Sequence, residues 1–173
     1  MAINDQDATG VHQDTPLALS LSAVSKRYGE RLAVADLNLH MAAGETLGFL
    51  GPNGAGKTTT IRIATGFLRP TSGQVQLLGC DMHDPRQALQ ARARLGYVPD
   101  VAGLDPGATG AWLLDELAGL QGAPPCDRAL LIEQLELDPG DLRRPMGRLS
   151  RGTRQKINIV QGLQHRPDLL ILD

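Results

Sequence analysis

Residues 46–60 read Thr-Leu-Gly-Phe-Leu-Gly-Pro-Asn-Gly-Ala-Gly-Lys-Thr-Thr-Thr, and this stretch decides the fold. Residues 46–50 are nearly all apolar, which predicts a strand buried on both faces. Residues 51–58 match the pattern G-x-x-x-x-G-K-[ST], and a helix is expected to follow from about Lys57 to Phe67. A strand, a glycine-rich loop and a helix in this order are the context in which the pattern binds phosphate. The buried face of that helix is expected to hold Ile61, Ala64, Phe67 and Leu68.

The residue types in this loop suit a triphosphate. Glycines let consecutive backbone N–H groups point toward phosphate oxygens at close range, and the N-terminus of the following helix adds its dipole. Lys57 is expected to place its charge beside the β- and γ-phosphates, and Thr58 to ligate Mg²⁺. The expected phosphate-binding residues are Gly51, Pro52, Asn53, Gly54, Ala55, Gly56, Lys57, Thr58 and Thr59. The loop alone leaves kinases, GTPases and ATPases open.

Composition excludes several classes of partner. The chain has 173 residues, a formal net charge of −2 and only 3% aromatic residues, which argues against binding to nucleic acid. No apolar run approaches the roughly 20 residues of a membrane helix. Cys80 and Cys126 lie far apart and form no C-x-x-C pair, which fits a reducing compartment. Residues 1–15 are polar and contain no secretory signal, so a mobile tail is expected there.

Strand and helix patterns alternate along the rest of the chain, which predicts an α/β fold. Strands are expected at residues 17–21, 37–41, 74–79, 95–98 and 169–172. Helices are expected at residues 85–94, at 108–137 with a break at 122–125, and from Ser150 to about Gln164. The expected organisation is a tail (1–15), a core (16–100), a helical subdomain (101–150), and a helix with a final strand (151–173). The core is expected to be that of a P-loop NTPase, with a mostly parallel sheet, an N-terminal antiparallel β portion and the helical subdomain as an insertion.

Two further stretches narrow the class. Leu149-Ser150-Arg151-Gly152-Thr153 stands at the start of a helix, and the strand at 169–172 ends in Asp173. Together with Gly-Pro-Asn-Gly-Ala-Gly-Lys-Thr-Thr-Thr at 51–60, they make the chain from about Leu17 to Asp173 resemble the ATP-binding cassette (ABC) ATPases. That family has the signature L-S-G-G-Q before a helix and an aspartate at the end of its Walker B strand.

The resemblance implies roles for particular residues. ATP and Mg²⁺ would be bound, with Lys57, Ser150 and Asp173 as the catalytic residues. Ser150, Arg151 and Gly152 would contact the γ-phosphate bound in a second ABC subunit, either an identical chain or a different one. Thr58, Asp100 and Asp173 would hold Mg²⁺, and Tyr28 would stack on the adenine ring.

Three departures from the family pattern point to a subgroup. Arg151 replaces the first signature glycine, Thr153 replaces the glutamine, and Asp100 stands where most members carry another glutamine. The combination of the acidic Asp100 with Ser150-Arg151-Gly152 resembles the ATPases of drug, antibiotic or polysaccharide exporters more than those of nutrient importers. The resemblance therefore implies an ATP-hydrolysing subunit that works with a transmembrane permease subunit on the cytoplasmic face of the membrane, without nucleic acid.

Two alternatives remain open on sequence alone. The family places a general-base glutamate directly after the Walker B aspartate, and this sequence ends at Asp173, so it resembles a C-terminally truncated member. This chain alone is expected to bind nucleotide poorly and to hydrolyse it slowly or not at all, and a non-catalytic nucleotide-binding fragment is one alternative. The other is a soluble, non-transport ABC ATPase, although the long linkers and basic patches of that group are missing.

Overall fold

The computed structural model describes residues 16–99, 105–122 and 124–173. The expected tail at 1–15 and Asp100 therefore lie outside the described residues. Contacts divide the chain into two units, Met1–Ala91 and Arg92–Asp173. The sequence-based boundaries at 100 and 150 stay predictions.

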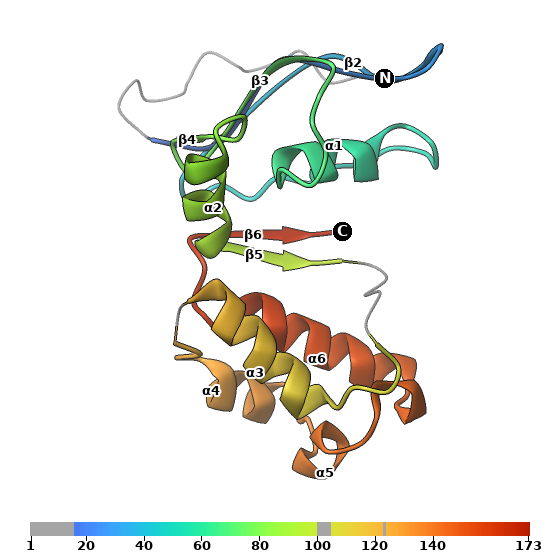
Figure 1. Cartoon of the computed structure of the whole chain (residues 1–173), viewed down its shortest axis with the longest axis vertical. Helices are drawn as coiled ribbons and strands as arrows, with labels where there is room; N and C mark the ends of the chain where they lie inside the picture. The colour runs from blue at the N-terminus through green and yellow to red at the C-terminus, as the bar shows by residue number, and fades with distance from the viewer. Residues whose placement is uncertain (1–15, 100–104, 123) are drawn as a thin grey trace. The chain divides into compact units, whose positions relative to one another are not determined.

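The first unit is built on a long β-hairpin. Strands β1 (Leu17–Tyr28) and β2 (Arg31–Ala42) pair antiparallel around the two-residue turn Gly29-Glu30. On the other side of β1, β3 (Ser72–Leu77) also pairs antiparallel, and the short β4 (Cys80–Asp81) follows it. The sheet order is β2-β1-β3-β4, and Figure 1 labels β2, β3 and β4 of this sheet. This sheet is the N-terminal antiparallel portion that the alternating patterns predicted.

Helix α1 (Lys57–Ala64) packs on this sheet, with contacts to β1, β2 and β3. The buried core here includes Leu21, Val24, Ile63, Val75 and Leu77, each with 1% or less of its surface exposed.

The expected end and buried face of α1 were partly wrong. The helix stops at Ala64, where the Thr65 hydroxyl donates to the Ile61 carbonyl at 2.9 Å and Gly66 adopts a left-handed φ of 75°. A left-handed glycine is a common helix terminator. Phe67 therefore lies beyond the helix and is 64% exposed, while Ile63, which the expected face left out, is buried.

Residues 46–50 also differ from expectation. No sheet of the described residues includes them, and Leu50 is 94% exposed. An apolar segment becomes a strand only when a neighbouring strand satisfies its backbone hydrogen bonds. In the described residues β1 is paired on both sides, and the outer edges of β2 and β4 do not pair with this segment either, so its backbone has no strand partner.

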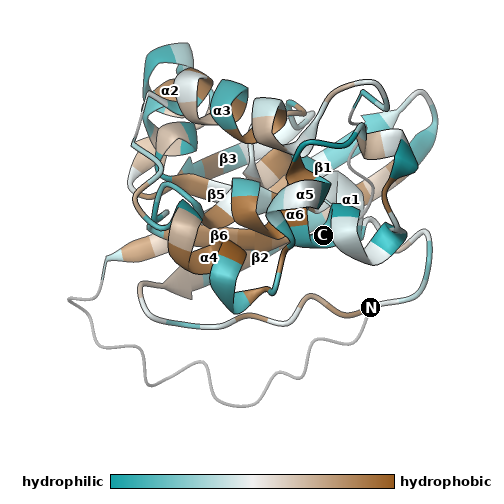
Figure 2. Cartoon of the chain, turned by 90° about the horizontal axis from the view of Figure 1, so that it is seen from below, coloured by the Kyte–Doolittle hydropathy of each residue, from teal (hydrophilic) through white to brown (hydrophobic). Residues whose placement is uncertain are grey.

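The second unit contains the parallel part of the described structure. After α2 (Pro85–Ala93), strand β5 (Leu95–Val98) pairs parallel with β6 (Leu169–Leu172), and both strands match their expected bounds. Figure 2 shows β6 coloured as hydrophobic. Helix α6 (Arg151–Leu163) packs closely on β5. A Cβ atom on Gly96 would lie 2.3 Å from the Gly162 carbonyl oxygen, so the two glycines permit this approach.

The remaining helices lie in the same unit. They are α3 (Gly110–Gln121), α4 (Arg128–Gln134), the four-residue α5 (Pro139–Leu142) and a 3₁₀ turn (Met146–Arg148). Helices α3 and α4 pack on α6, and α5 packs on α3 (Figure 1). Helix α3 ends at Gly122, which has a φ of 64°, so the predicted break between two helices is confirmed. The shared core consists of Leu113, Leu114, Leu137, Met146, Leu149, Ile157 and Val160.

Candidate nucleotide-binding site

The phosphate loop, residues 51–58, has the backbone that its glycines predict. Gly54 and Gly56 have φ values of 84° and 88°, in the left-handed region that other residues rarely adopt. A Cβ atom on Gly56 would lie 2.5 Å from the carbonyl oxygen of Ala33, at the start of β2. The loop therefore lies directly against the hairpin, and glycine is required at position 56 for both reasons.

Lys57 is the first residue of α1, and its ammonium group lies across the loop. The Nζ atom donates to the carbonyl oxygens of Gly51 at 2.6 Å and Pro52 at 3.0 Å. No side chain caps the N-terminus of α1, and its first turn contains no acidic residue. The dipole of the helix and the charge of Lys57 thus favour an anion at the same place.

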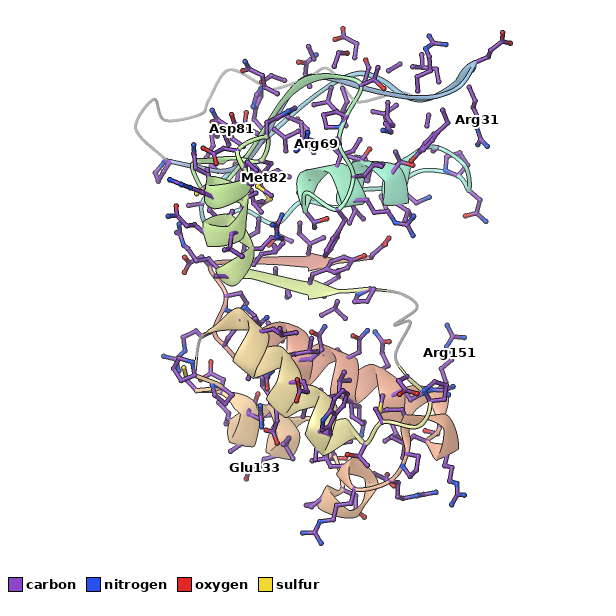
Figure 3. All side chains as sticks on the ribbon, in the orientation of Figure 1. Arg31, Arg69, Asp81, Met82, Glu133 and Arg151 are labelled. Carbon is purple, nitrogen blue, oxygen red and sulfur yellow. The ribbon has the colours of Figure 1, made fainter. Side chains whose placement is uncertain are left out.

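Tyr28 is the last residue of β1, and its side chain is 50% exposed. It pairs with Arg31, two residues before the Ala33 carbonyl that touches Gly56. Figure 3 shows Arg31 at this end of the hairpin. The described geometry therefore brings the expected adenine platform and the phosphate loop to one end of the first unit.

Residues 149–153 form the start of α6 in the second unit. Ser150 is the N-cap residue, and its Oγ accepts a hydrogen bond from the Thr153 backbone N–H at 3.0 Å. The two hydroxyl oxygens of Ser150 and Thr153 are 2.8 Å apart. Arg151 and Gly152 are exposed, and Figure 3 shows Arg151 extending away from the helix. Thr153 is thus a direct partner of the predicted site serine, which the family pattern alone did not indicate.

Asp173 follows β6 and is held by the neighbouring strand. Its backbone N–H donates to the Val98 carbonyl at 3.0 Å, and the Tyr97 hydroxyl donates to its Oδ2 at 3.3 Å. Sequence reasoning missed Tyr97. The parallel register, which pairs Tyr97 with Ile171, could have placed it near the strand end, but register is fixed by contacts distant in sequence.

Two polar side chains on α6, one buried and one half-buried, were also missed. Asn158 has 2% of its surface exposed and donates to the Pro99 carbonyl at 2.8 Å. Gln161 donates to the Tyr97 carbonyl at 2.7 Å. These bonds hold the carboxyl end of β5, immediately before Asp100, against the helix that begins at Ser150. Their signal in the sequence is weak, because an asparagine or glutamine in a helix is also common on the exposed face and does not by itself indicate burial.

His165, just after α6, is buried against β5. Its Nε2 is 3.2 Å from the Leu95 carbonyl oxygen, which can only accept, so Nε2 carries the proton and Nδ1 does not. That Nδ1 is buried without a hydrogen-bond partner. Burial lowers the pKa of His165 below its ordinary value, and the bond to Leu95 acts in the opposite direction. The residue therefore stays neutral in the folded protein at neutral pH.

Metal ligation has no ready-made cluster in the part of the chain that the structure describes. No group of three or more His, Cys, Asp or Glu residues is placed there to hold an ion. Thr58 is exposed in the first turn of α1, and Asp173 belongs to the second unit. A magnesium ion at Thr58 would therefore depend on oxygens supplied by a bound phosphate.

Comparisons with known proteins agree with one another. The family described as "ABC transporter" matches residues 34–173. The Nod factor export ATP-binding protein I of Paraburkholderia xenovorans is 38% identical over 163 residues, which cover 90% of this chain and 52% of that protein. The chain spans about half the length of the curated relatives it matches.

Solved structures give the fold. An ATP-binding subunit of an ABC transporter superposes with a TM-score of 0.80 at 26% identity, covering 90% of this chain and 65% of that one. The dimeric bacterial ABC transporter cassette MJ0796 superposes with a TM-score of 0.77 at 23% identity, covering 90% and 73%. The expected α/β P-loop NTPase fold is confirmed by these similarities.

Proposed function

This chain belongs to the ABC transporter family, and on that premise we propose that it is the ATP-binding part of an exporter's motor subunit. The observation that carries the proposal is the phosphate loop. Two left-handed glycines, one of them packed against Ala33, shape its backbone, and Lys57 lies across it. Because ABC ATPases hydrolyse ATP as a family, the expected reaction of the whole protein is attack of water on the γ-phosphate.

Within this proposal the first unit binds the nucleotide. The phosphate oxygens accept hydrogen bonds from the N–H groups of residues 51–59, and Lys57 exchanges its bonds with Gly51 and Pro52 for bonds to phosphate. Since those two bonds are to neutral carbonyls, a charged phosphate oxygen is the stronger acceptor for the ammonium group. Tyr28 provides its exposed ring as the surface on which adenine stacks.

We propose that the residues predicted from the sequence to bind Mg²⁺ would hold the ion together with the phosphates. When bound, the ion neutralises charge on the β- and γ-phosphates. Thr58 supplies a hydroxyl oxygen beside the phosphates, and Asp173 supplies a carboxylate that the Tyr97 hydroxyl orients. Asp100 is the third proposed ligand.

The second unit carries the surface proposed to meet a second ABC subunit. Ser150 and the N–H groups at the start of α6 would contact the γ-phosphate bound in that subunit, with Gly152 leaving the approach open and Arg151 adding charge. The dimeric state of the cassette MJ0796 supports this arrangement. Either an identical chain or a different cassette could fill the second position.

Export is supported by the name of a relative and by the subgroup features of this sequence. The 38% identical protein is described as an export ATP-binding protein, and Arg151 and Asp100 fit the exporter pattern. None of the described helices is both long and apolar enough to cross a bilayer. We therefore propose a transmembrane permease subunit as the partner, with this chain on the cytoplasmic face of the membrane.

Equilibrium binding of ATP tests the nucleotide site. Isothermal titration of the purified protein with MgATP should give saturable binding, and Lys57→Ala should weaken it by at least about tenfold. Arg86→Ala, which removes an exposed positive charge elsewhere in the first unit, serves as the matched control and should bind like the wild type. Equal affinities of Lys57→Ala and the wild type would refute the proposed site.

Purification from detergent-solubilised membranes tests the partner. A co-purifying membrane protein whose retention depends on this chain supports the exporter. Co-purification of ribosomal RNA or DNA in its place would favour the soluble, non-transport alternative.

A further inference from the structure

We infer that Lys26 is a positioning residue for adenine. Its ammonium group lies over the ring of Tyr28 and is hydrogen-bonded to the backbone that follows α1. The inference rests on the proposed function, in which Tyr28 stacks on the base. It adds a second residue to the base site. That residue would change the π-electron density of the Tyr28 ring and restrict the orientation of the ring. The lysine does not touch the phosphate in this assignment.

The position of the ammonium group is defined by two contacts. Lys26 Nζ lies 5.3 Å from the centroid of the Tyr28 ring, within the range of a cation–π interaction. The same atom donates to the Arg69 carbonyl oxygen at 2.7 Å. Figure 3 labels Arg69 in the connection between α1 and β3.

That connection is itself fixed to β1. The backbone N–H of Arg27 donates to the Thr71 hydroxyl at 3.0 Å, and the Thr71 N–H donates to the Ser25 carbonyl at 2.8 Å. The anchor of Lys26 is therefore a backbone carbonyl held by bonds on both sides of the lysine. A flexible lysine is otherwise free to move through solvent, so this anchor keeps its charge at one place.

The charge on Lys26 affects how Tyr28 meets a base. A cation held at the ring draws π-electron density toward itself, which lowers the repulsion between the ring and the π-cloud of a stacked purine. It also restricts the ring to the orientation that keeps this contact. Because Tyr28 is half exposed, the ring retains accessible surface for the base. The two effects both favour stacking, and neither acts on the triphosphate.

The matched pair of ligands for the test is MgATP and magnesium tripolyphosphate, which share the phosphates but not the base. Isothermal titration would be performed on the wild type, Lys26→Met, Lys26→Arg, Tyr28→Ala and the charge control Arg86→Met. Lys26→Met keeps a chain of similar length without the charge. We expect it to weaken ATP binding roughly two- to fivefold, the size of an exposed cation–π contact, and to leave the tripolyphosphate affinity unchanged.

Each outcome decides the question. Restoration of ATP affinity by Lys26→Arg supports the inference, because a guanidinium group also binds an aromatic face. If Lys26→Met weakens both ligands equally, or weakens neither, the inference is wrong while the phosphate-loop site stands. If Tyr28→Ala binds ATP like the wild type, the base platform and the role of Lys26 are both wrong. Failure of the wild type to bind either ligand overturns the proposed function itself.

Discussion

Two glycines in this chain stand at helix N-termini, Gly56 as the N-cap of α1 and Gly152 in the first turn of α6, and the structure uses them differently. In the phosphate loop, Gly56 has a φ of 88° and leaves no room for a side chain beside Ala33. At the start of α6, Gly152 has no left-handed φ, and a Cβ atom added to it would have the Ser150 Oγ as its nearest neighbour, at 3.9 Å. The backbone therefore requires the first glycine. The backbone around the second leaves room for a side chain.

The two helix starts also resemble each other in one respect. Lys57 and Arg151 each occupy the first helical position, where a positive charge opposes the helix dipole. Such a charge costs stability in an isolated helix, and an anion bound at either position would offset that cost. They differ in capping, because Gly56 provides no side-chain cap whereas Ser150 caps its own helix. In α1 more of the N–H groups are left for a ligand.

The largest expected effect separates the two glycines. Gly56→Ala should lower the free energy of unfolding by about 2–4 kcal/mol, because it adds a left-handed alanine and a contact with backbone. Gly152→Ala should change it by less than about 1 kcal/mol, since alanine also has the higher helix propensity. Urea unfolding followed by circular dichroism measures both. Similar losses of unfolding free energy for the two variants would mean that the two glycine positions do not differ as described.

The two positive charges should affect different measurements. Lys57 should matter for ATP binding within one chain, and Arg151 for association with a second subunit. Lys57→Met should weaken ATP binding by at least about tenfold, as expected for loss of a charge-assisted bond of about 1.5–3 kcal/mol. Arg151→Met should leave ATP binding by a single chain unchanged and weaken ATP-dependent association with the second subunit. Titration calorimetry and analytical ultracentrifugation with and without ATP provide the two readouts. Loss of ATP affinity in Arg151→Met would place that residue in the nucleotide site of its own chain.

Features that depend on residues close together in the sequence could be predicted, whereas features that depend on residues far apart in the sequence could not. The phosphate loop and the strands β5 and β6 depend on short patterns, and their bounds were predicted closely. The strand expected at 46–50 and the face of α1 that included Phe67 failed, because strand pairing and helix termination depend on neighbours outside the pattern. Lys26 was missed for the same reason, since its anchor at Arg69 is 43 residues away. The functional roles of all these site residues stay predictions.

A smaller effect concerns the capping serine. Ser150→Ala should lower the free energy of unfolding by about 1 kcal/mol, because the Thr153 N–H loses its acceptor. Ser150→Gly should cost only a few tenths of a kcal/mol relative to serine, and it gives α6 the kind of cap that α1 has. Urea unfolding of both variants beside the wild type provides the comparison. If glycine costs as much as alanine at position 150, capping does not account for the difference between the helices.

The smallest expected effect compares the opposite ends of the two helices. Helix α1 ends at Thr65, whose hydroxyl bonds to backbone carbonyls and does not titrate near neutral pH. Helix α6 is followed by His165, whose buried Nδ1 has no acceptor for a proton. Because burial lowers the pKa of His165 below its ordinary value of 6.5, the unfolded chain binds a proton at a higher pH than the folded protein does.

The sign of the pH dependence follows from that difference. Well above pH 6.5 His165 is neutral in both states and its contribution to stability is complete, whereas stability falls as the pH decreases through 6.5 toward the lower folded-state pKa. Hydrogen exchange at pH 5.5 and 7.5 should therefore show α6 and β6 losing protection at the lower pH more than α1 and β1 do, after correction for intrinsic exchange rates. His165→Gln, which keeps a donor for Leu95 but does not titrate, should remove this difference, and the exposed His83→Gln should not. An unchanged difference in His165→Gln would assign the pH dependence to other groups of the second unit.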